Sequence, residues 1–162
     1  MKVAGFTFIR NAILYDFPVV EAITSVLPLC EAFFVAVGKS EDDTYGLIQA
    51  IDPEKITILE TEWDTSLKKG GFVYADETNK AFDAIPPAYD WCIYIQGDEV
   101  LHEKYLELVK SAMEKWLPVK EISGLLFHYR HFYGSYDYIG DSRHWYRREV
   151  RVIRNNKNII TE

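Results

Sequence analysis

Three polar side chains follow a short apolar segment closely enough to act together. Gln96, Asp98 and Glu99 come directly after the segment 91–95, Trp-Cys-Ile-Tyr-Ile. Mg²⁺ and Mn²⁺ are hard cations that take one or two carboxylates together with the phosphates of a substrate. Gly97 allows the backbone to turn tightly between the polar residues. The pattern therefore predicts a site for a metal-bridged diphosphate, with Asp98 and Glu99 as metal ligands.

The same two carboxylates have an alternative, purely structural interpretation. A helix is expected after them, and acidic side chains at the start of a helix interact favourably with its positive end. Asp98 and Glu99 would then act as helix caps. From this short pattern alone, both interpretations stay open.

The element that carries these residues decides where they would lie. Segment 91–95 is β-branched and aromatic and follows Pro86-Pro87, which predicts a strand buried on both faces. Such strands belong to parallel sheets. In open α/β sheets, ligands bind beyond the carboxyl ends of the strands. Residues 96–99 are therefore expected at that edge of the sheet.

The rest of the chain alternates between predicted strands and helices. Strands are predicted at 3–9, 32–37 and 56–59, and helices from Asp16 to Pro28, within 41–52, and at 74–85 and 102–116. Further strands are predicted within 121–140 and 144–155, joined by a connection rich in Gly and Tyr. This order predicts a single α/β domain over 1–162, with a mainly parallel open sheet, flanking helices and an antiparallel addition.

Composition limits the classes of protein to consider. The chain has 162 residues, 48% of them hydrophobic, without an apolar run of the roughly 18 to 20 residues that a membrane span needs. The first residues resemble a strand and not a signal peptide, so a cytoplasmic location without a transmembrane segment is expected. Cys30 and Cys92 lie in apolar surroundings and are expected to be buried thiols.

Charge argues against a nucleic-acid partner. The net charge of −7 opposes general affinity for phosphate backbones. The segment from His128 to Arg154 is locally basic, and it could bind a phosphate or could consist of solvated strand edges. It contains six arginines, Arg130, Arg143, Arg147, Arg148, Arg151 and Arg154. Its three acidic residues are Asp137, Asp141 and Glu149.

Several familiar motifs are missing from the sequence. Gly38-Lys39-Ser40 is not a phosphate-binding P-loop, because Phe33 stands where that motif requires Gly. The first strand is not followed by Gly-x-Gly-x-x-Gly, and no serine lies in a Gly-x-Ser-x-Gly elbow. His128 and His131 would lie on opposite faces of a strand, which disfavours zinc.

In their order along the chain, these features resemble family 2 glycosyltransferases with the GT-A fold. In that family the first strand leads into an Asn-bearing turn, matched by Arg10-Asn11. The second strand ends in an acidic loop that holds the nucleotide, matched by Ser40 to Thr44, which includes Asp43. The resemblance covers roughly residues 2–103.

Two further features extend the resemblance. A Gly-led helix with an inward Asn is matched by Gly70, Gly71 and Asn79, and the metal-binding Asp-x-Asp turn by Gln96-Gly97-Asp98. The later segment 147–159 also resembles an Arg-rich strand of some members.

The sequence departs from the family pattern at three places. Gln96 replaces the first Asp of the turn, which leaves Asp98, with Glu99 nearby, to hold a metal. Gly38-Lys39 replaces an acidic pair, and Lys39 could meet a phosphate or an acidic sugar. The chain ends at Glu162, so the acceptor-binding part is expected to be mostly absent.

The resemblance implies transfer of a sugar from a nucleotide-diphosphate sugar to an unknown carbohydrate, lipid or protein acceptor. It also implies inversion at the anomeric carbon and assistance by Mg²⁺ or Mn²⁺. Asp137 and Asp141 are the candidates for the catalytic base. The candidates for binding the nucleotide sugar are Arg10, Asn11, Lys39, Ser40, Asp43, Asn79, Gln96 and Gly97. The aromatic residues of segment 132–146 could stack on a sugar or pack in a core.

Two other classes of function stay open. A non-catalytic module could bind a nucleotide sugar without transferring it. A metal-dependent phosphoryl-transfer enzyme could use the same acidic turn.

Overall fold

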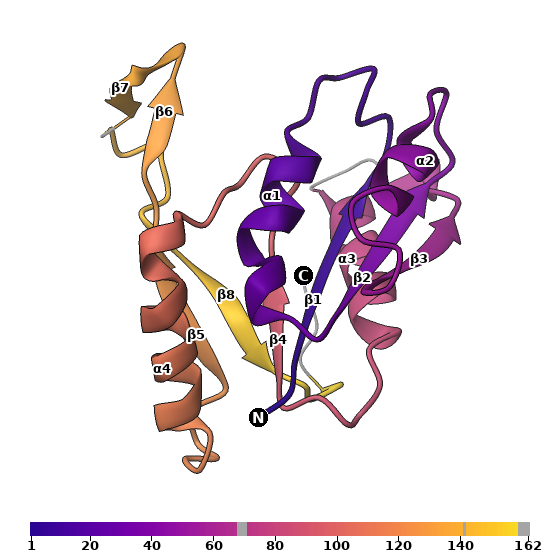
Figure 1. The fold of residues 1–162 in the computed structure, drawn as a ribbon. Helices are drawn as coiled ribbons and strands as arrows, with labels where there is room; N and C mark the ends of the chain where they lie inside the picture. The colour runs from indigo at the N-terminus through magenta and orange to yellow at the C-terminus, as the bar shows by residue number, and fades with distance from the viewer. Residues whose placement is uncertain (68–70, 141, 159–162) are drawn as a thin grey trace.

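A computed structural model describes residues 1–67, 71–140 and 142–158 (Figure 1). The main sheet has six strands in the order β3-β2-β1-β4-β8-β5, and β1 to β4 run parallel while β8 is antiparallel to both of its neighbours. The strands are β1 (Val3–Ile9), β2 (Ala32–Gly38), β3 (Ile56–Thr61), β4 (Trp91–Tyr94), β5 (Gly124–His128) and β8 (Arg148–Arg154). The predicted α/β class, a mainly parallel sheet with an antiparallel addition, is confirmed.

Helices cover both faces of this sheet (Figure 1). The helices are α1 (Val19–Val26), α2 (Thr44–Gln49), α3 (Phe72–Asp83) and α4 (Leu106–Trp116), with 3₁₀ turns at Leu27–Leu29, Thr65–Leu67 and Glu103–Tyr105. One core cluster joins α1, α2 and α4 to one face, with Ile23, Phe33 and Trp91 at its centre. A second cluster joins α3 to the other face through Phe6 and Phe82. The buried faces of β1, β2 and β4 are thus explained by helices on both sides.

Two predicted helix starts are wrong. Asp16 does not open the first helix, which begins at Val19 after Pro18 as N-cap. Residues 11–17 instead form backbone-bonded turns in which Phe17 N–H donates to Ala12 O (2.9 Å), and Asp16 adopts a left-handed φ of 53°.

The second correction concerns the helix after the acidic turn. It was expected from His102, but α4 begins at Leu106, after the 3₁₀ turn that His102 caps by accepting a hydrogen bond from Lys104 N (3.3 Å). Asp98 and Glu99 do not cap this helix, so that alternative interpretation is wrong.

The predicted Gly- and Tyr-rich connection forms a small separate hairpin. Its strands β6 (His131–Tyr133) and β7 (Ser135–Gly140) pair antiparallel around Gly134, whose φ is 72°. The hairpin stands clear of the main sheet, beyond α4 (Figure 1). Many of its aromatic side chains are exposed, including Tyr136 and Tyr138.

Both cysteines are free and buried, as predicted. Burial raises the pKa of the Cys30 and Cys92 thiols to about 12. Within the described part of the chain, every helix is too short or too polar to cross a membrane. The cytoplasmic location stays a prediction, as does the division into one domain.

Two arginines of the basic segment make contacts within the protein and are not simply part of a solvated strand edge. Arg154 lies 4.0 Å from the ring of Trp91 and donates through Nη2 to the carbonyl oxygens of Trp116 (2.7 Å), Leu117 (2.9 Å) and Val119 (3.0 Å), so it binds the end of α4. Arg151 is 7% exposed and points toward the acidic turn.

Candidate functional site

A pocket of about 580 Å³ opens at the carboxyl ends of β1 and β4. The chain leaves β1 toward β2 on one side, and β4 lies on the other side, so this is the point where the strand order reverses. Ligands of open α/β sheets bind at such points. The lining residues are Phe8, Ile9, Arg10, Asn11, Tyr15, Phe17, Glu41, Trp63, Tyr74, Gln96, Gly97 and Asp98.

Hydrogen bonds join the loop after β1 to the loop after β2. Asn11, which is 3% exposed, donates from its backbone N–H to Ser40 Oγ (3.0 Å) and accepts at Oδ1 from Glu41 N–H (2.8 Å). Its φ is 53°, a left-handed conformation that Asn tolerates better than most residues. Ala12 N–H donates to Thr44 Oγ1 (2.8 Å). The two loops are therefore held as one unit along this side of the pocket.

Asp42 strengthens that connection. Its carboxylate accepts hydrogen bonds from Leu14 N–H (2.7 Å) and from the backbone and hydroxyl of Thr44. Desolvation raises the pKa of Asp42, but these hydrogen bonds outweigh it and the net pKa is lowered. Asp42 is therefore an ionised structural acceptor, and it joins the loops without lining the pocket.

Aromatic side chains form one wall of the pocket. Phe8 and Tyr74 stack with their ring centroids 5.8 Å apart, and Trp63 lies 5.9 Å from Phe8 and 5.7 Å from Tyr74. The guanidinium carbon of Arg10 is 5.6 Å from the Trp63 ring centroid, within cation–π range. Gly38 permits this arrangement, because a Cβ there would lie 2.3 Å from Trp63 Nε1.

Two buried donors in this wall are unsatisfied. Arg10 Nε and Trp63 Nε1 have no hydrogen-bond partner among the residues that the structure describes. Buried N–H groups nearly always have an acceptor, and leaving one unpaired costs about 1–3 kcal/mol. Both residues line the pocket, although these two nitrogen atoms are themselves buried.

The acidic turn forms the other side of the pocket. Glu99 N–H donates to Gln96 O (3.1 Å), which closes a turn over residues 96–99. Gly97 is not among the described glycines with positive φ, which are Gly71 and Gly134. Its lack of a side chain serves packing instead, because a Cβ at Gly97 would lie 3.0 Å from Ile9 Cδ1. Asp98 lies exposed on the pocket's surface.

Glu99 is turned away from the pocket into an ion pair. Arg151 Nε donates to Glu99 Oε2 (2.9 Å) and Arg151 Nη2 to Oε1 (2.7 Å), and each side chain is 9% exposed. Glu99 Oε2 also accepts from Gln96 N–H (3.1 Å). The Arg151 guanidinium lies between the rings of Tyr94 (5.3 Å) and Tyr129 (5.2 Å). Metal ligation by Glu99 would require this pair to open.

The donor set fits an ion that arrives with a diphosphate. No cluster of three or more metal-binding side chains occurs in the described residues. Mg²⁺ and Mn²⁺ nevertheless bind through one or two carboxylates when phosphates and water complete their coordination. Asp98 is an exposed carboxylate of that kind, and Gln96 lines the same pocket. The metal prediction itself stays untested.

The structure brings some of the predicted site residues to the pocket and places others around it. Arg10, Asn11, Gln96, Gly97 and Asp98 line it. The other predicted residues lie outside the lining. Lys39 is exposed and Asn79 is half-buried on α3. Ser40 forms hydrogen bonds with Asn11 and Gly38, and Asp43 caps α2 by accepting from Gly46 N–H (3.0 Å).

The aromatic wall was not predicted from the sequence, and Glu41 was included only as part of the loop Ser40 to Thr44. Trp63 follows β3, and the rule that ligands lie beyond strand ends would have found it if applied to the third strand. Tyr74 lies in the first turn of α3, a helix on which Asn79 was the predicted site residue. Phe17 lies in the segment that was predicted to be the start of the first helix, and Tyr15 lies in the turns just before it.

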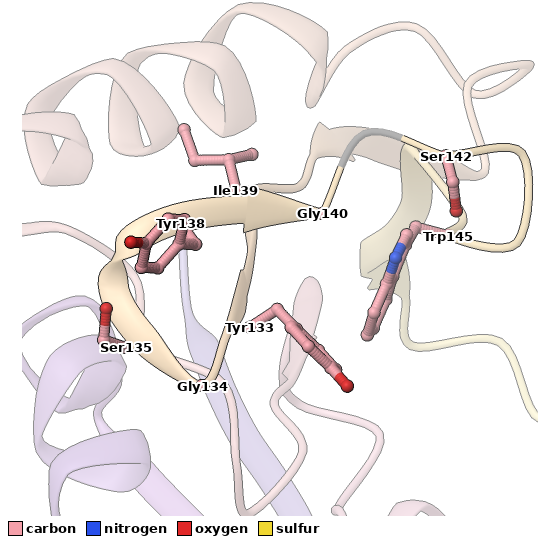
Figure 2. A pocket seen from close by; sticks show the side chains of 8 residues that line it. All are labelled: Tyr133, Gly134, Ser135, Tyr138, Ile139, Gly140, Ser142 and Trp145. Carbon is pink, nitrogen blue, oxygen red and sulfur yellow. The ribbon is translucent and has the colours of Figure 1, made fainter.

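The candidate catalytic bases lie elsewhere or outside the described residues. Asp137 is exposed in β7, and its backbone N–H donates to Ser135 Oγ (3.2 Å). Asp141 lies outside the described residues. The hairpin has its own open pocket of about 750 Å³ (Figure 2), where Tyr133 and Trp145 meet edge to face with ring centroids 6.4 Å apart.

The class defined by this fold and pocket is a GT-A-like, Rossmann-like α/β protein. Comparison with solved structures leads to TarS of S. aureus, a glycosyltransferase. The crystal structure of TarS 1–349 is 14% identical with a TM-score of 0.51 over 71% of this chain. The same TarS region in complex with UDP gives the same identity, TM-score and coverage of this chain.

The chain spans about a third of the length of these structures, 33% and 32%. No protein-family model matches the chain, and neither does any curated protein. At this identity the likeness shows the fold.

Proposed function

We propose that this chain binds a nucleotide-diphosphate sugar in the pocket between β1 and β4 and takes part in transferring its sugar. The single observation that carries the proposal is the pocket itself, at the switch point of a GT-A-like sheet. It combines two unpaired buried N–H donors, an aromatic wall and an exposed carboxylate. The likeness to a TarS structure solved in complex with UDP supports a nucleotide as the ligand.

Each side of the pocket meets a different part of such a ligand. Arg10 lines the pocket and offers a cation to phosphate oxygens. Trp63 and Tyr74 offer aromatic faces to a planar base. Asp98 would otherwise repel a diphosphate, and this is the reason to propose a divalent cation between them.

In this proposal Asp98 holds Mg²⁺ or Mn²⁺, with Gln96 beside it. Such an ion, when bound, stabilises the negative charge that develops on the leaving diphosphate. Glu99, as the partner of Arg151, would support the turn. The inverting stereochemistry remains part of the proposal, as does the identity of the general base. Asp137 and Asp141 are its candidates.

Isothermal titration with UDP tests the proposal. UDP should bind, and Mn²⁺ should strengthen binding over a sample with EDTA. Asp98→Asn should weaken Mn²⁺-dependent binding at least about tenfold, because a charge-assisted contact is worth about 1.5–3 kcal/mol. Its melting temperature should stay near that of the parent, since the side chain is exposed.

Glu114→Gln is the matched control, because it removes an exposed carboxylate from α4, none of whose residues line the pocket. It should bind UDP as the parent does. Equal UDP affinity with Mn²⁺ and with EDTA would contradict the metal role, and absence of UDP binding would contradict the site. Release of free sugar or transfer from a UDP-sugar then separates a transferase from a binding module.

A further inference from the structure

We infer that Arg151 is a positioning residue: from β8 it holds the turn that presents Asp98 to the pocket, through Glu99. The contacts form one continuous chain of interactions. The Arg151 guanidinium donates hydrogen bonds to both carboxylate oxygens of Glu99, and Glu99 Oε2 also accepts one from the backbone N–H of Gln96. Asp98 lies between Gln96 and Glu99 in the sequence, within the turn that the Glu99 side chain closes onto Gln96 N–H.

The contact between Arg151 and Glu99 fixes the orientation of the Glu99 side chain. Two parallel N–H···O bonds of 2.7 and 2.9 Å fix the plane of the carboxylate relative to the guanidinium. The guanidinium is itself confined between the rings of Tyr94 and Tyr129. Tyr94 ends β4, so the strand before the turn and the last residue of the turn both contact Arg151.

The residues around Arg151 and Glu99 shield their ion pair from solvent. Desolvation lowers the pKa of Arg151, but the hydrogen bonds and charge of Glu99 outweigh it and the net pKa is raised. Burial, opposed by Arg151 and reinforced by Glu99, raises the pKa of the Tyr129 phenol. Arg151 and Tyr129 therefore keep their protons at neutral pH.

A lysine cannot reproduce this arrangement. Its ammonium is a single point donor, whereas the guanidinium presents a planar fork that matches a carboxylate. Arg151→Lys therefore keeps the charge and loses the orientation of Glu99. Arg154→Lys is the matched control: the same substitution three residues along β8, at an arginine that binds the end of α4 and not the turn.

The first measurement is amide hydrogen exchange by NMR, without ligand. Exchange of the Gln96 and Glu99 amides should be at least about tenfold faster in Arg151→Lys than in the parent, while Arg154→Lys leaves these two amides within about twofold. Equal rates in Arg151→Lys and the parent, or equal acceleration in both variants, would overturn the inference.

The second measurement is UDP affinity, and this readout rests on the proposed function. Arg151→Lys should weaken the Mn²⁺-dependent part of UDP binding at least about fivefold and leave binding in EDTA within about twofold, because the aromatic wall is unaffected. Arg154→Lys should bind as the parent does. Loss of binding in EDTA by Arg151→Lys would mark a general collapse of the site and overturn the inference.

Two provisions keep the outcomes distinct. If the parent does not bind UDP, the proposed function fails and the exchange rates still decide the inference. If Arg151→Lys does not fold, Glu99→Gln replaces it. The amide keeps the shape and one acceptor oxygen but loses the charge, and the same acceleration at Gln96 and Glu99 is expected.

Discussion

The two sides of the pocket are held in different ways. On the β1–β2 side, several hydrogen bonds from backbone N–H groups to Ser40, Asp42 and Thr44 join two loops. On the β4 side, one ion pair joins Glu99 to Arg151, 52 residues later. The first arrangement distributes stability over many contacts, whereas the second concentrates it in one. Single substitutions should therefore have unequal effects on the two sides.

The largest effect is expected on the concentrated side. Arg151→Met should lower the free energy of unfolding by about 3–5 kcal/mol, because it leaves the Glu99 carboxylate buried without its partner. Urea denaturation measures the loss. The double variant Arg151→Met/Glu99→Gln should recover a large part of it, since the unpaired charge is gone. A single-variant loss under about 1 kcal/mol would show that the pair is not the main support of this side.

A smaller effect is expected where the contacts are distributed. Thr44→Val keeps the side-chain shape but removes the oxygen that accepts from Ala12 N–H, at a fully buried position. The unpaired N–H should cost about 1–3 kcal/mol, again measured by urea denaturation.

Thr24→Val is the control for that substitution. The exposed Thr24 hydroxyl donates to Val20 O of its own helix (2.7 Å), so its loss should change the free energy of unfolding by less than about 0.5 kcal/mol. If both valine variants lost the same stability, the hydrogen bond of Thr44 would not be what joins the loops.

The contrast between the two sides also explains what sequence could predict. The parallel sheet and the place of Asp98 followed from local patterns: a buried apolar run, breaker residues and an acidic turn. Arg10 and Asn11 were assigned to the site through the resemblance to family 2 glycosyltransferases, on the turn that follows the first strand. Periodicity and turn chemistry act within a few residues, and they predicted what depends on a few residues.

The ion pair and the aromatic wall depend on tertiary structure. Nothing in the basic segment distinguishes Arg151 from its neighbours Arg147 and Arg148 until β8 is placed antiparallel beside β4. Trp63 and Tyr74 come from two elements that meet only when α3 packs over β1 and β2. The same limit applies to Glu99, whose carboxylate could be a ligand, a cap or an ion-pair partner on sequence grounds.

The smallest effect is expected at Gly97, on the β4 side, and Gly38 on the β2 side provides its contrast. Gly38→Ala would place a Cβ 2.3 Å from Trp63 Nε1, so the indole must move, at a cost of about 1–3 kcal/mol. In Gly97→Ala the new Cβ would lie 3.0 Å from Ile9 Cδ1, the end of a flexible side chain, and at ordinary contact distance from Val19 Cγ2 (3.8 Å).

Gly97→Ala should change the free energy of unfolding by less than about 1 kcal/mol, because two terms oppose each other. The small shift of Ile9 destabilises the variant. The φ of Gly97 is outside the positive range that strains other residues, so alanine also reduces the entropy of the unfolded chain, which stabilises by about 0.4–1 kcal/mol. Urea denaturation of both variants measures the difference. A turn that is held by the ion pair of Glu99 with Arg151 should tolerate an added methyl group, whereas a turn that depends on a glycine backbone conformation should not. A loss of stability at Gly97 as large as that at Gly38 would therefore mean that the turn depends on its glycine and not on Arg151.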